Sequence, residues 1–232
     1  MKADLHIHTY YSFDGFSSPK EIVKTAISKG INCIAITDHN EIKGAIEAMR
    51  FAFDKDILVI PGIEILSEAG DILGLNVKEI IPDGLSAEKT IEEIKKRGGI
   101  AVIPHPFDWP LENFFLKKNG IKNLNIDAIE VFNASVFFKS SNKKAFDFAR
   151  EYDLAFSAGS DAHQAKFVGR GYLEFKKKIN SEIELIEEIK NKKAKVGGKA
   201  LGFWEVAGNS SVSFRRAIRF YNFKRKFKKK KN

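Results

Sequence analysis

Three observations in the sequence predict an α/β fold built around a mainly parallel sheet. Short apolar runs rich in Ile, Val and Leu alternate with segments of helical periodicity, which is the pattern of βα units. The 232 residues are enough for one domain with a substantial core. The hydrophobic fraction of 44% and the charged fraction of 30% are those of an ordinary globular protein.

The expected elements follow one another in a regular order. We expect strands at 2–8, 32–37, 57–64, 71–77, 100–104, 127–132, 155–159 and 171–175, and helices at 18–30, 41–53, 86–97, 141–152 and 181–192. Ser18 with Glu21 forms the pattern of a capping box, in which two side chains satisfy free amides at a helix start. Ser181 with Glu184 repeats this pattern, and Pro19 suits the first helical position, where no N–H is needed.

Two segments interrupt this rhythm. Residues 106–126 are irregular and aromatic, which is typical of a long loop or a short helix beside a site. Beyond about Gly198 the alternation of strands and helices is lost. We therefore expect a domain over residues 1–198 and a C-terminal linker with a basic aromatic tail over residues 199–232.

The positive charge of the chain is concentrated in this tail. The formal net charge is +9, but the ten cations from Arg215 onward leave residues 1–214 at −1. Residues 214–231 mix Phe and Tyr with these cations at helical spacing. The pattern favours a solvated run first, attraction to nucleic acid or to an acidic substrate second, and a membrane surface last.

Cysteine content and hydropathy indicate a cytoplasmic protein. The single cysteine, Cys33, lies in an apolar stretch, so it excludes an intramolecular disulfide and is expected to be a small buried hydrophobic residue. The chain opens on a strand pattern without a charged and apolar leader. No run approaches the roughly 18 apolar residues of a membrane span. We therefore expect a soluble chain.

All five histidines lie in short motifs at or near the ends of expected strands. They are His6, His8, His39, His105 and His163. Neutral imidazole is the commonest protein metal ligand, so this distribution predicts a metal site. His6 and His8 are two residues apart on one strand, which places both imidazoles on the same face.

Three carboxylates accompany the histidines. Asp14 lies in the loop after the first expected strand, Glu64 ends the third, and Asp161 follows the strand at 155–159. In parallel α/β folds, sites form at the C-terminal edge of the strands. Five imidazoles with three carboxylates exceed the needs of one tetrahedral ion. They suit two or three ions that share a carboxylate and clamp the oxygens of a phosphoryl displacement.

The motifs Asp-Leu-His-Ile-His, Thr-Asp-His, Gly-Ile-Glu, Pro-His-Pro and Ser-Asp-Ala-His, in this order, resemble those of the PHP (polymerase and histidinol phosphatase) superfamily over residues 1–198. The resemblance implies a distorted seven-stranded βα barrel, up to three Mn, Zn or Fe ions, and hydrolysis of phosphoesters. Carried over position by position, it makes the following residues metal ligands, with Glu64 as the bridging carboxylate: His6, His8, Asp14, His39, Glu64, His105, Asp161 and His163.

The sequence departs from the family pattern in two ways. Many members carry a further histidine in the middle of the chain, whereas here Asp71 or Glu130 is the candidate for an additional ligand. The interval from Glu64 to His105 is short, so the inserted domain of the nucleotide-phosphatase branch is absent. The substrate preference of that branch therefore does not transfer to this chain.

Other polar residues flank the expected ligands. Asp4 and Asp38 are expected either behind the ligands, where they would orient imidazoles, or on the plain surface. Arg170 follows the last motif and is a candidate to bind substrate phosphate through two hydrogen bonds, or to form a structural salt bridge. Asn40 and Asn133 are further candidates to line the pocket.

We therefore expect a metal-dependent phosphoesterase acting on a small phosphomonoester, a nucleotide or a short oligonucleotide. The expected nucleophile is a metal-activated hydroxide that attacks phosphorus in line, with no separate protein base assigned. No Gly-rich phosphate loop, Gly-x-Ser-x-Gly motif or cysteine nucleophile motif is present, which disfavours covalent catalysis. The alternatives are a nuclease acting on RNA or DNA ends with help from residues 214–231, and a non-catalytic scaffold stabilised by metal.

Overall fold

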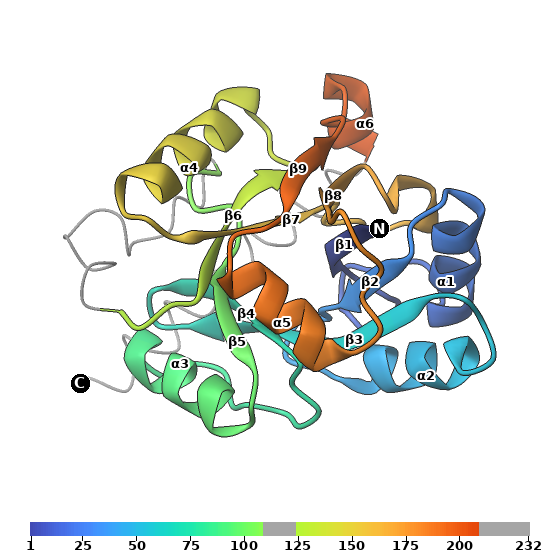
Figure 1. Ribbon diagram of the computed structural model, residues 1–232, viewed down its shortest axis with the longest axis horizontal. Coiled ribbons are helices and arrows are strands. Elements are labelled where there is room, and N and C mark those ends of the chain that lie inside the picture. Colours follow the sequence, from blue (N-terminus) through green and yellow to red (C-terminus); the bar gives the residue numbers. More distant parts are fainter. Residues whose placement is uncertain (109–123, 209–232) are drawn as a thin grey trace.

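A single nine-stranded sheet forms the centre of the molecule, in a computed structural model that describes residues 1–108 and 124–208 (Figure 1). The strands are β1 (Lys2–Ile7), β2 (Cys33–Ile36), β3 (Leu58–Ser67), β4 (Gly70–Leu75), β5 (Ile100–Ile103), β6 (Ala128–Asn133), β7 (Ala155–Gly159), β8 (Gly171–Glu174) and β9 (Lys195–Gly198). The helices are α1 (Pro19–Ser28), α2 (Lys43–Ala52), α3 (Ala87–Lys96), α4 (Lys139–Glu151), α5 (Glu182–Lys190) and α6 (Phe203–Gly208), with a 3₁₀ turn at Ala165–Phe167.

The sheet curls into a nearly closed barrel. Its strand order is β7-β6-β5-β4-β3-β2-β1-β8-β9. The segment after β7 returns to β1, where His8 N donates to Ala162 O at 2.9 Å and Asp161 N donates to His6 O at 2.8 Å. Strands β1 to β3 and β5 to β7 are parallel, whereas β4 is antiparallel to both neighbours. The expected α/β barrel is confirmed.

The number of strands differs from the expected seven. Strands β1 to β7 account for the barrel ring, and β8 and β9 are added as an antiparallel pair beside β1. Strand β9 was not predicted, because this four-residue strand contains two glycines and no buried residue. Strand β3 also runs past Glu64 to Ser67, because its last residues pair with the antiparallel strand β4.

The helix starts follow the expected chemistry. Ser18 accepts a hydrogen bond from Glu21 N while the Glu21 carboxylate accepts one from Ser18 N, which confirms the capping box at α1. Ser181 also accepts from Glu184 N. The Glu184 carboxylate, however, accepts from Asn180 N at 2.9 Å, so the reciprocal bond reaches one residue further back than expected.

Apolar side chains fill the barrel and close one end of it. Leu5, Ile60 and Leu75 belong to an interior cluster that also contains Leu185 and Ile189 of α5. Helix α5 lies across the centre of the ring in Figure 1. It therefore covers the barrel with apolar residues. The fully buried Cys33 belongs to the same cluster, as expected, and its burial raises the pKa of the thiol.

Residues 199–208 pack against the barrel. Lys199 N donates to Arg170 O at 2.7 Å, and Leu201 N donates to Ala134 O at 2.8 Å. Leu201 and Val206 are buried among residues of β1, β2 and the first two helices. The tail at 214–231 and most of the segment at 106–126 lie outside the described residues. Among the described helices, none combines the length and hydropathy of a membrane span.

Candidate metal centre

The expected ligands converge at one edge of the barrel. His6 and His8 come from the end of β1, His39 follows β2, and His105 follows β5. A parallel bridge between His39 and Glu64 joins the end of β2 to the middle of β3. The C-terminal edge of the parallel strands is therefore where these side chains meet, as the sequence predicts.

Four overlapping groups of side chains could hold metal ions. Within each group, the candidate ligand atoms all lie within 4.8 Å of one another. The groups are His8, Asp14, His39 and His163; His6, His105 and Asp161; His6, His8 and Glu64; and His39, Glu64 and Asp71. The structure thus brings together all eight residues proposed from the sequence, with Asp71 beside them.

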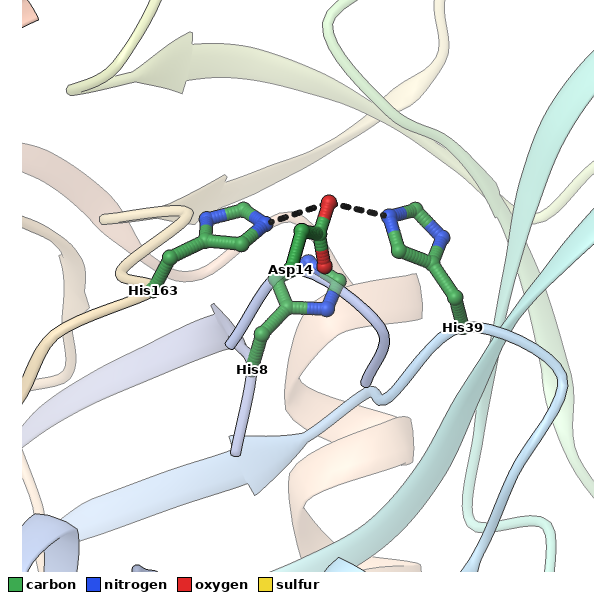
Figure 2. A group of neighbouring side chains, drawn as sticks. All are labelled: His8, Asp14, His39 and His163. Carbon is green, nitrogen blue, oxygen red and sulfur yellow. Dashed lines mark ion pairs between the residues drawn. The ribbon is translucent and has the colours of Figure 1, made fainter. Parts of the chain in front are cut away.

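Asp14 stands between two imidazoles in the first group (Figure 2). Its Oδ2 atom lies 3.3 Å from His163 Nε2 and 3.5 Å from His39 Nε2. Asp14 and His163 are 0% exposed, and His39 is 7% exposed. A carboxylate and imidazoles at such distances inside the protein make a compact set of ligands for one divalent ion.

Glu64 connects the groups to one another. Its Oε2 atom lies 3.0 Å from His39 Nδ1, 3.2 Å from His8 Nε2 and 3.5 Å from His6 Nε2. Its Oε1 atom lies 3.3 Å from His105 Nε2. One carboxylate therefore contacts four imidazoles, which is the arrangement that a bridging ligand requires.

Asp161, which follows β7, contacts the imidazoles from the segment that lies beside β1. Its Oδ1 atom lies 3.3 Å from His8 Nε2 and 3.6 Å from both His6 Nε2 and His163 Nδ1. Asp161 and His105 have positive φ angles of 50° and 28°. Non-glycine residues rarely adopt this backbone region, and such strain is concentrated at functional sites.

Several polar atoms of the centre are buried without a hydrogen-bond partner in the described part of the chain. They are Asp14 Oδ1 and Oδ2, His39 Nδ1 and Nε2, Glu64 Oε2 and His163 Nε2. Burying such atoms unsatisfied is costly, and most buried polar atoms in proteins are paired. Coordination to divalent cations would satisfy them. Because imidazole and carboxylate ligands suit Zn, Mn and Fe, the residues fit the metals expected from the family resemblance.

The acids of the centre control the charge of its histidines. Burial alone would lower the pKa of His8, but the acidic neighbours Asp161 and Glu64 raise it to about 9. The pKa of His6 also rises well above its usual value, because acidic neighbours outweigh burial. For His39 the effect of burial exceeds that of the nearby acids, and the pKa falls to about 4. A metal ion that binds these imidazoles must displace their protons, so metal affinity and proton affinity are in competition.

Glu130 lies behind the histidines and outside the four groups. Its Oε1 atom lies 3.1 Å from His6 Nδ1, and its Oε2 atom accepts from His105 N at 2.8 Å and from Asn133 Nδ2 at 3.0 Å. Of the two candidates for an additional ligand, Asp71 alone joins a group. Glu130 instead fixes the ring of His6, and carboxylates in this position orient metal-binding imidazoles.

Ser12 is a residue of the centre that sequence reasoning missed. Its Oγ atom lies 3.1 Å from His8 Nδ1 and accepts a hydrogen bond from His39 N at 2.9 Å. It therefore ties together two histidines from different strands. The sequence offers only a weak signal for this role, namely the position of Ser12 two residues before Asp14 in the same loop.

Asp4 and Asp38 are buried, and both accept hydrogen bonds from loop residues. Asp4 accepts from Ser160 N at 2.8 Å and from Gly169 N at 2.7 Å. Asp38 accepts from Thr9 N at 2.6 Å and from the Thr9 hydroxyl at 2.7 Å. Both side chains are 0% exposed, which excludes surface placement. Burial raises the pKa of Asp4 to about 6.

The remaining candidates occupy different surroundings. Arg170 Nη2 lies 2.5 Å and 2.7 Å from the two carboxylate oxygens of Glu205, and Arg170 forms this ion pair at the surface. Asn133 Nδ2 reaches Asp161 Oδ2 at 3.3 Å, so Asn133 does line the centre. Asn40 Oδ1 accepts from Leu66 N at 3.1 Å and supports β3.

Comparison with known sequences agrees with these motifs. A family model described as PHP-associated matches residues 139–194. An uncharacterized protein of Methanocaldococcus jannaschii is 44% identical over 146 residues, which are 58% of this chain and 82% of the relative. A 5′-3′ exoribonuclease of Haemophilus influenzae is 30% identical over 119 residues, which are 46% of this chain and 43% of that enzyme.

Solved structures share the fold at lower sequence identity. A protein of Bifidobacterium adolescentis assigned as a metal-dependent phosphoesterase superposes with a TM-score of 0.60 at 18% identity, covering 83% of this chain and 96% of that one. Endonuclease Q, solved with a duplex that carries an abasic lesion at its active site, superposes with a TM-score of 0.62 at 18% identity, covering 82% of this chain and 56% of that one. The ordered ligand motifs, the barrel and these similarities lead to one conclusion: the chain belongs to the PHP superfamily.

Proposed function

We propose that this chain is a metal-dependent phosphoesterase that cleaves a small phosphomonoester, a nucleotide or a short oligonucleotide. The observation that carries the proposal is the position of Glu64, whose carboxylate contacts four imidazoles and links the candidate metal groups. Adjacent ions that share a carboxylate are typical of enzymes that act on phosphate esters. The metal-dependent phosphoesterase and the nucleases among the similar proteins support the same reaction class.

Two or three divalent ions would occupy the centre. His8, Asp14, His39 and His163 would hold one ion, and His6, His8 and Glu64 a second. The groups His6, His105 and Asp161, or His39, Glu64 and Asp71, are available for a third. Bound divalent ions would lower the pKa of a water molecule and neutralise charge that develops on the phosphoryl group. We name Mn, Zn and Fe as the candidate metals.

The surrounding residues keep the imidazoles in position. Glu130 fixes the His6 ring through Nδ1, which directs Nε2 toward Glu64 and Asp161. The Ser12 hydroxyl likewise fixes the His8 ring, through the His8 Nδ1 atom. Hydrogen bonds on the far side of the ring therefore position His6 and His8. Such outer partners raise metal affinity because the ligands lose little freedom on binding.

A nuclease is the second candidate function. The 30% identity to a 5′-3′ exoribonuclease and the structural similarity to endonuclease Q favour it. In this version the basic residues of 214–231 would add affinity for the phosphate backbone. Truncation before Phe214 separates the two candidates. A nuclease would lose activity on polymers and keep activity on small phosphoesters, whereas truncation would leave the activity of a small-molecule phosphoesterase unchanged.

The direct test is hydrolysis of an aryl phosphate monoester and diester after chelation and addition of Mn²⁺ or Zn²⁺. We expect metal-dependent turnover that Asp161→Asn reduces by about two to three orders of magnitude, the usual effect of removing one group that stabilises the transition state. Asp56→Asn is the matched control, because Asp56 is an exposed acid far from the ligand groups. Bound metal without turnover of any phosphoester, including nucleotides and oligonucleotides, would contradict the proposal and favour the scaffold.

A further inference from the structure

Exposed aromatic side chains gather on two loops that leave the metal centre. Eight large aromatic side chains are exposed in the described part of the chain. Six of them lie in these loops: Tyr10, Tyr11, Phe13, Phe16, Phe137 and Phe138. Single exposed apolar residues are normal on a protein surface, but several gathered beside one site mark a place where something binds.

Both loops are built from the ends of strands that carry the centre. The first loop starts at His8 and contains the ligand candidate Asp14. The second follows β6, and in it the Ser135 hydroxyl donates to Ser160 O at 2.9 Å and to Asp161 O at 3.2 Å. The aromatic residues are therefore held on the same framework as the ligands.

Phe13 connects the aromatic surface to the metal ligands. Its ring stacks on the His39 ring, with centroids 5.2 Å apart and planes 28° apart. His39 is 7% exposed, whereas Phe13 is 43% exposed. Phe13 thus shields a ligand candidate from water and also presents apolar surface to solvent. A flat group bound beside the centre would find a rigid ring there.

Tyr10 and Tyr11 are also held in place although they are exposed. Their ring centroids are 4.7 Å apart, and both hydroxyls donate to Glu47 Oε2, at 3.0 Å and 2.9 Å. Glu47 belongs to α2, so one carboxylate ties the loop to a helix. Side chains fixed before binding lose less conformational entropy when a ligand arrives.

A ligand for these aromatic residues must carry a flat apolar ring and also a phosphoester that reaches the metal centre. A nucleobase joined to phosphate through its sugar has both features. Bases stack on aromatic side chains with little dependence on base identity, because every base has a π-face. We infer that Phe13 and the neighbouring aromatic residues bind the base of a nucleotide whose phosphoester lies at the metal centre. The placement of the phosphoester at the metal centre rests on the proposed phosphoesterase function.

Base binding is measured without turnover, by fluorescence anisotropy in the presence of a chelator. A labelled single-stranded oligonucleotide is compared with a fully abasic strand of the same length, so that attraction between phosphates and the basic tail is equal in both. A second pair compares competition by adenosine 5′-monophosphate and by ribose 5-phosphate. We expect about tenfold tighter binding of the base-containing member, which corresponds to one stacked base.

Three variants locate the effect. Phe13→Ala should reduce the preference for the base to less than about twofold, while Phe13→Trp should keep it, because tryptophan also offers a stacking surface. Phe53→Ala is the matched control, since Phe53 is 93% exposed at the end of α2 and lies in neither aromatic loop. It should bind both members of each pair as the wild type does.

The outcomes separate this inference from the proposed function. A base preference in the oligonucleotide pair alone indicates a nucleic-acid end as the substrate, and one in the mononucleotide pair indicates a free nucleotide; either supports the inference. Equal binding of both members in both pairs would overturn the inference. A base preference that is as strong in Phe13→Ala as in Phe53→Ala would overturn it too. Base preference without hydrolysis of any phosphoester would instead remove the proposed reaction and leave the base-binding surface.

Discussion

The strands of the barrel and the residues that follow them are equally buried but opposite in chemistry. In β2, Cys33–Ile36 are all apolar and 0% exposed. The next three residues, Thr37, Asp38 and His39, are polar and between 0% and 7% exposed. Burial of the first set stabilises the fold, whereas burial of polar groups costs free energy unless they are paired. Within one continuous segment, the apolar residues thus stabilise the fold, and the polar residues that follow them contribute to the candidate site.

The two ends of the barrel show the same contrast. Leu185 and Ile189 of α5 pack into the apolar interior cluster. At the other end of the interior, buried carboxylates and imidazoles contact one another around Glu64, with several atoms lacking hydrogen-bond partners in the described part of the chain. One end therefore supplies stability and the other supplies chemistry. Substitutions at the two ends should therefore differ in their effect on metal binding: those at the polar end should reduce it, and those at the apolar end should leave it unchanged.

The largest expected effect on the polar end comes from Glu64→Gln. Removing the charge of the bridging carboxylate should lower turnover of a phosphoester by about three orders of magnitude and reduce the number of ions bound. The metal-free protein should also unfold at a lower temperature, because the neutral amide no longer balances the charge of the protonated His6 and His8. Metal analysis and thermal denaturation in chelator measure the two effects. A large loss of stability with metal content unchanged would contradict the division between the two ends.

At the apolar end, Leu75→Ala should lower stability and leave metal binding unchanged. Leu75 is 1% exposed in the interior cluster. Its truncation should lower the free energy of unfolding by about 2–5 kcal/mol, the usual range for a buried leucine. Metal stoichiometry and turnover per folded molecule should not change. Ile183→Ala is the control, because Ile183 is 66% exposed on α5 and should shift stability by less than about 0.5 kcal/mol.

A smaller effect is expected from Glu130→Gln. Glu130 contacts the His6 ring from behind but belongs to no ligand group in the described residues. Loss of its charge should weaken metal affinity by about 10- to 100-fold, as for other partners of metal-binding imidazoles. Competition with a chelator of known affinity measures the change, and Glu151→Gln at the exposed end of α4 is the control. A change as large as that of Glu64→Gln would identify Glu130 as a ligand.

The smallest effect is expected from Arg170→Lys. Arg170 pairs with Glu205, which is 43% exposed on its side chain. If this surface pair is its role, kcat/KM should stay within about twofold of the wild-type value, as is usual for surface substitutions. Steady-state kinetics on a phosphomonoester measure it. A fall in kcat/KM of more than about tenfold, caused by a higher KM at unchanged kcat, would show that Arg170 binds the substrate phosphate. Arginine can bind phosphate in this way through two hydrogen bonds.

The ligands were predictable from sequence because each belongs to a short motif at the end of a recognisable strand. His6 and His8 needed only the two-residue repeat of a strand to share a face. Ser12 and the role of Glu130 were not predictable in this way. Their contacts with imidazoles depend on how loops and neighbouring strands meet in three dimensions. No local pattern encodes those distances.

Strand β9 illustrates the same limit for the fold. Its residues Lys195–Gly198 are exposed or half-buried and lack the alternation that marks a strand. They become a strand because β8 offers a partner, with Leu173 opposite Val196. The barrel ring was predictable because its apolar runs carry their own signal. An added edge strand depends on the neighbour that it pairs with.

The most direct test of the central claim is the number of divalent ions bound per chain, measured by elemental analysis after loading with Mn²⁺ or Zn²⁺ and removal of free metal. We predict two or three ions for the wild type, because the ligand groups overlap at Glu64. Glu64→Gln should hold fewer, and Leu75→Ala should hold the full number. A wild-type chain that binds no ions, at a metal concentration that saturates other phosphoesterases, would contradict the metal centre itself.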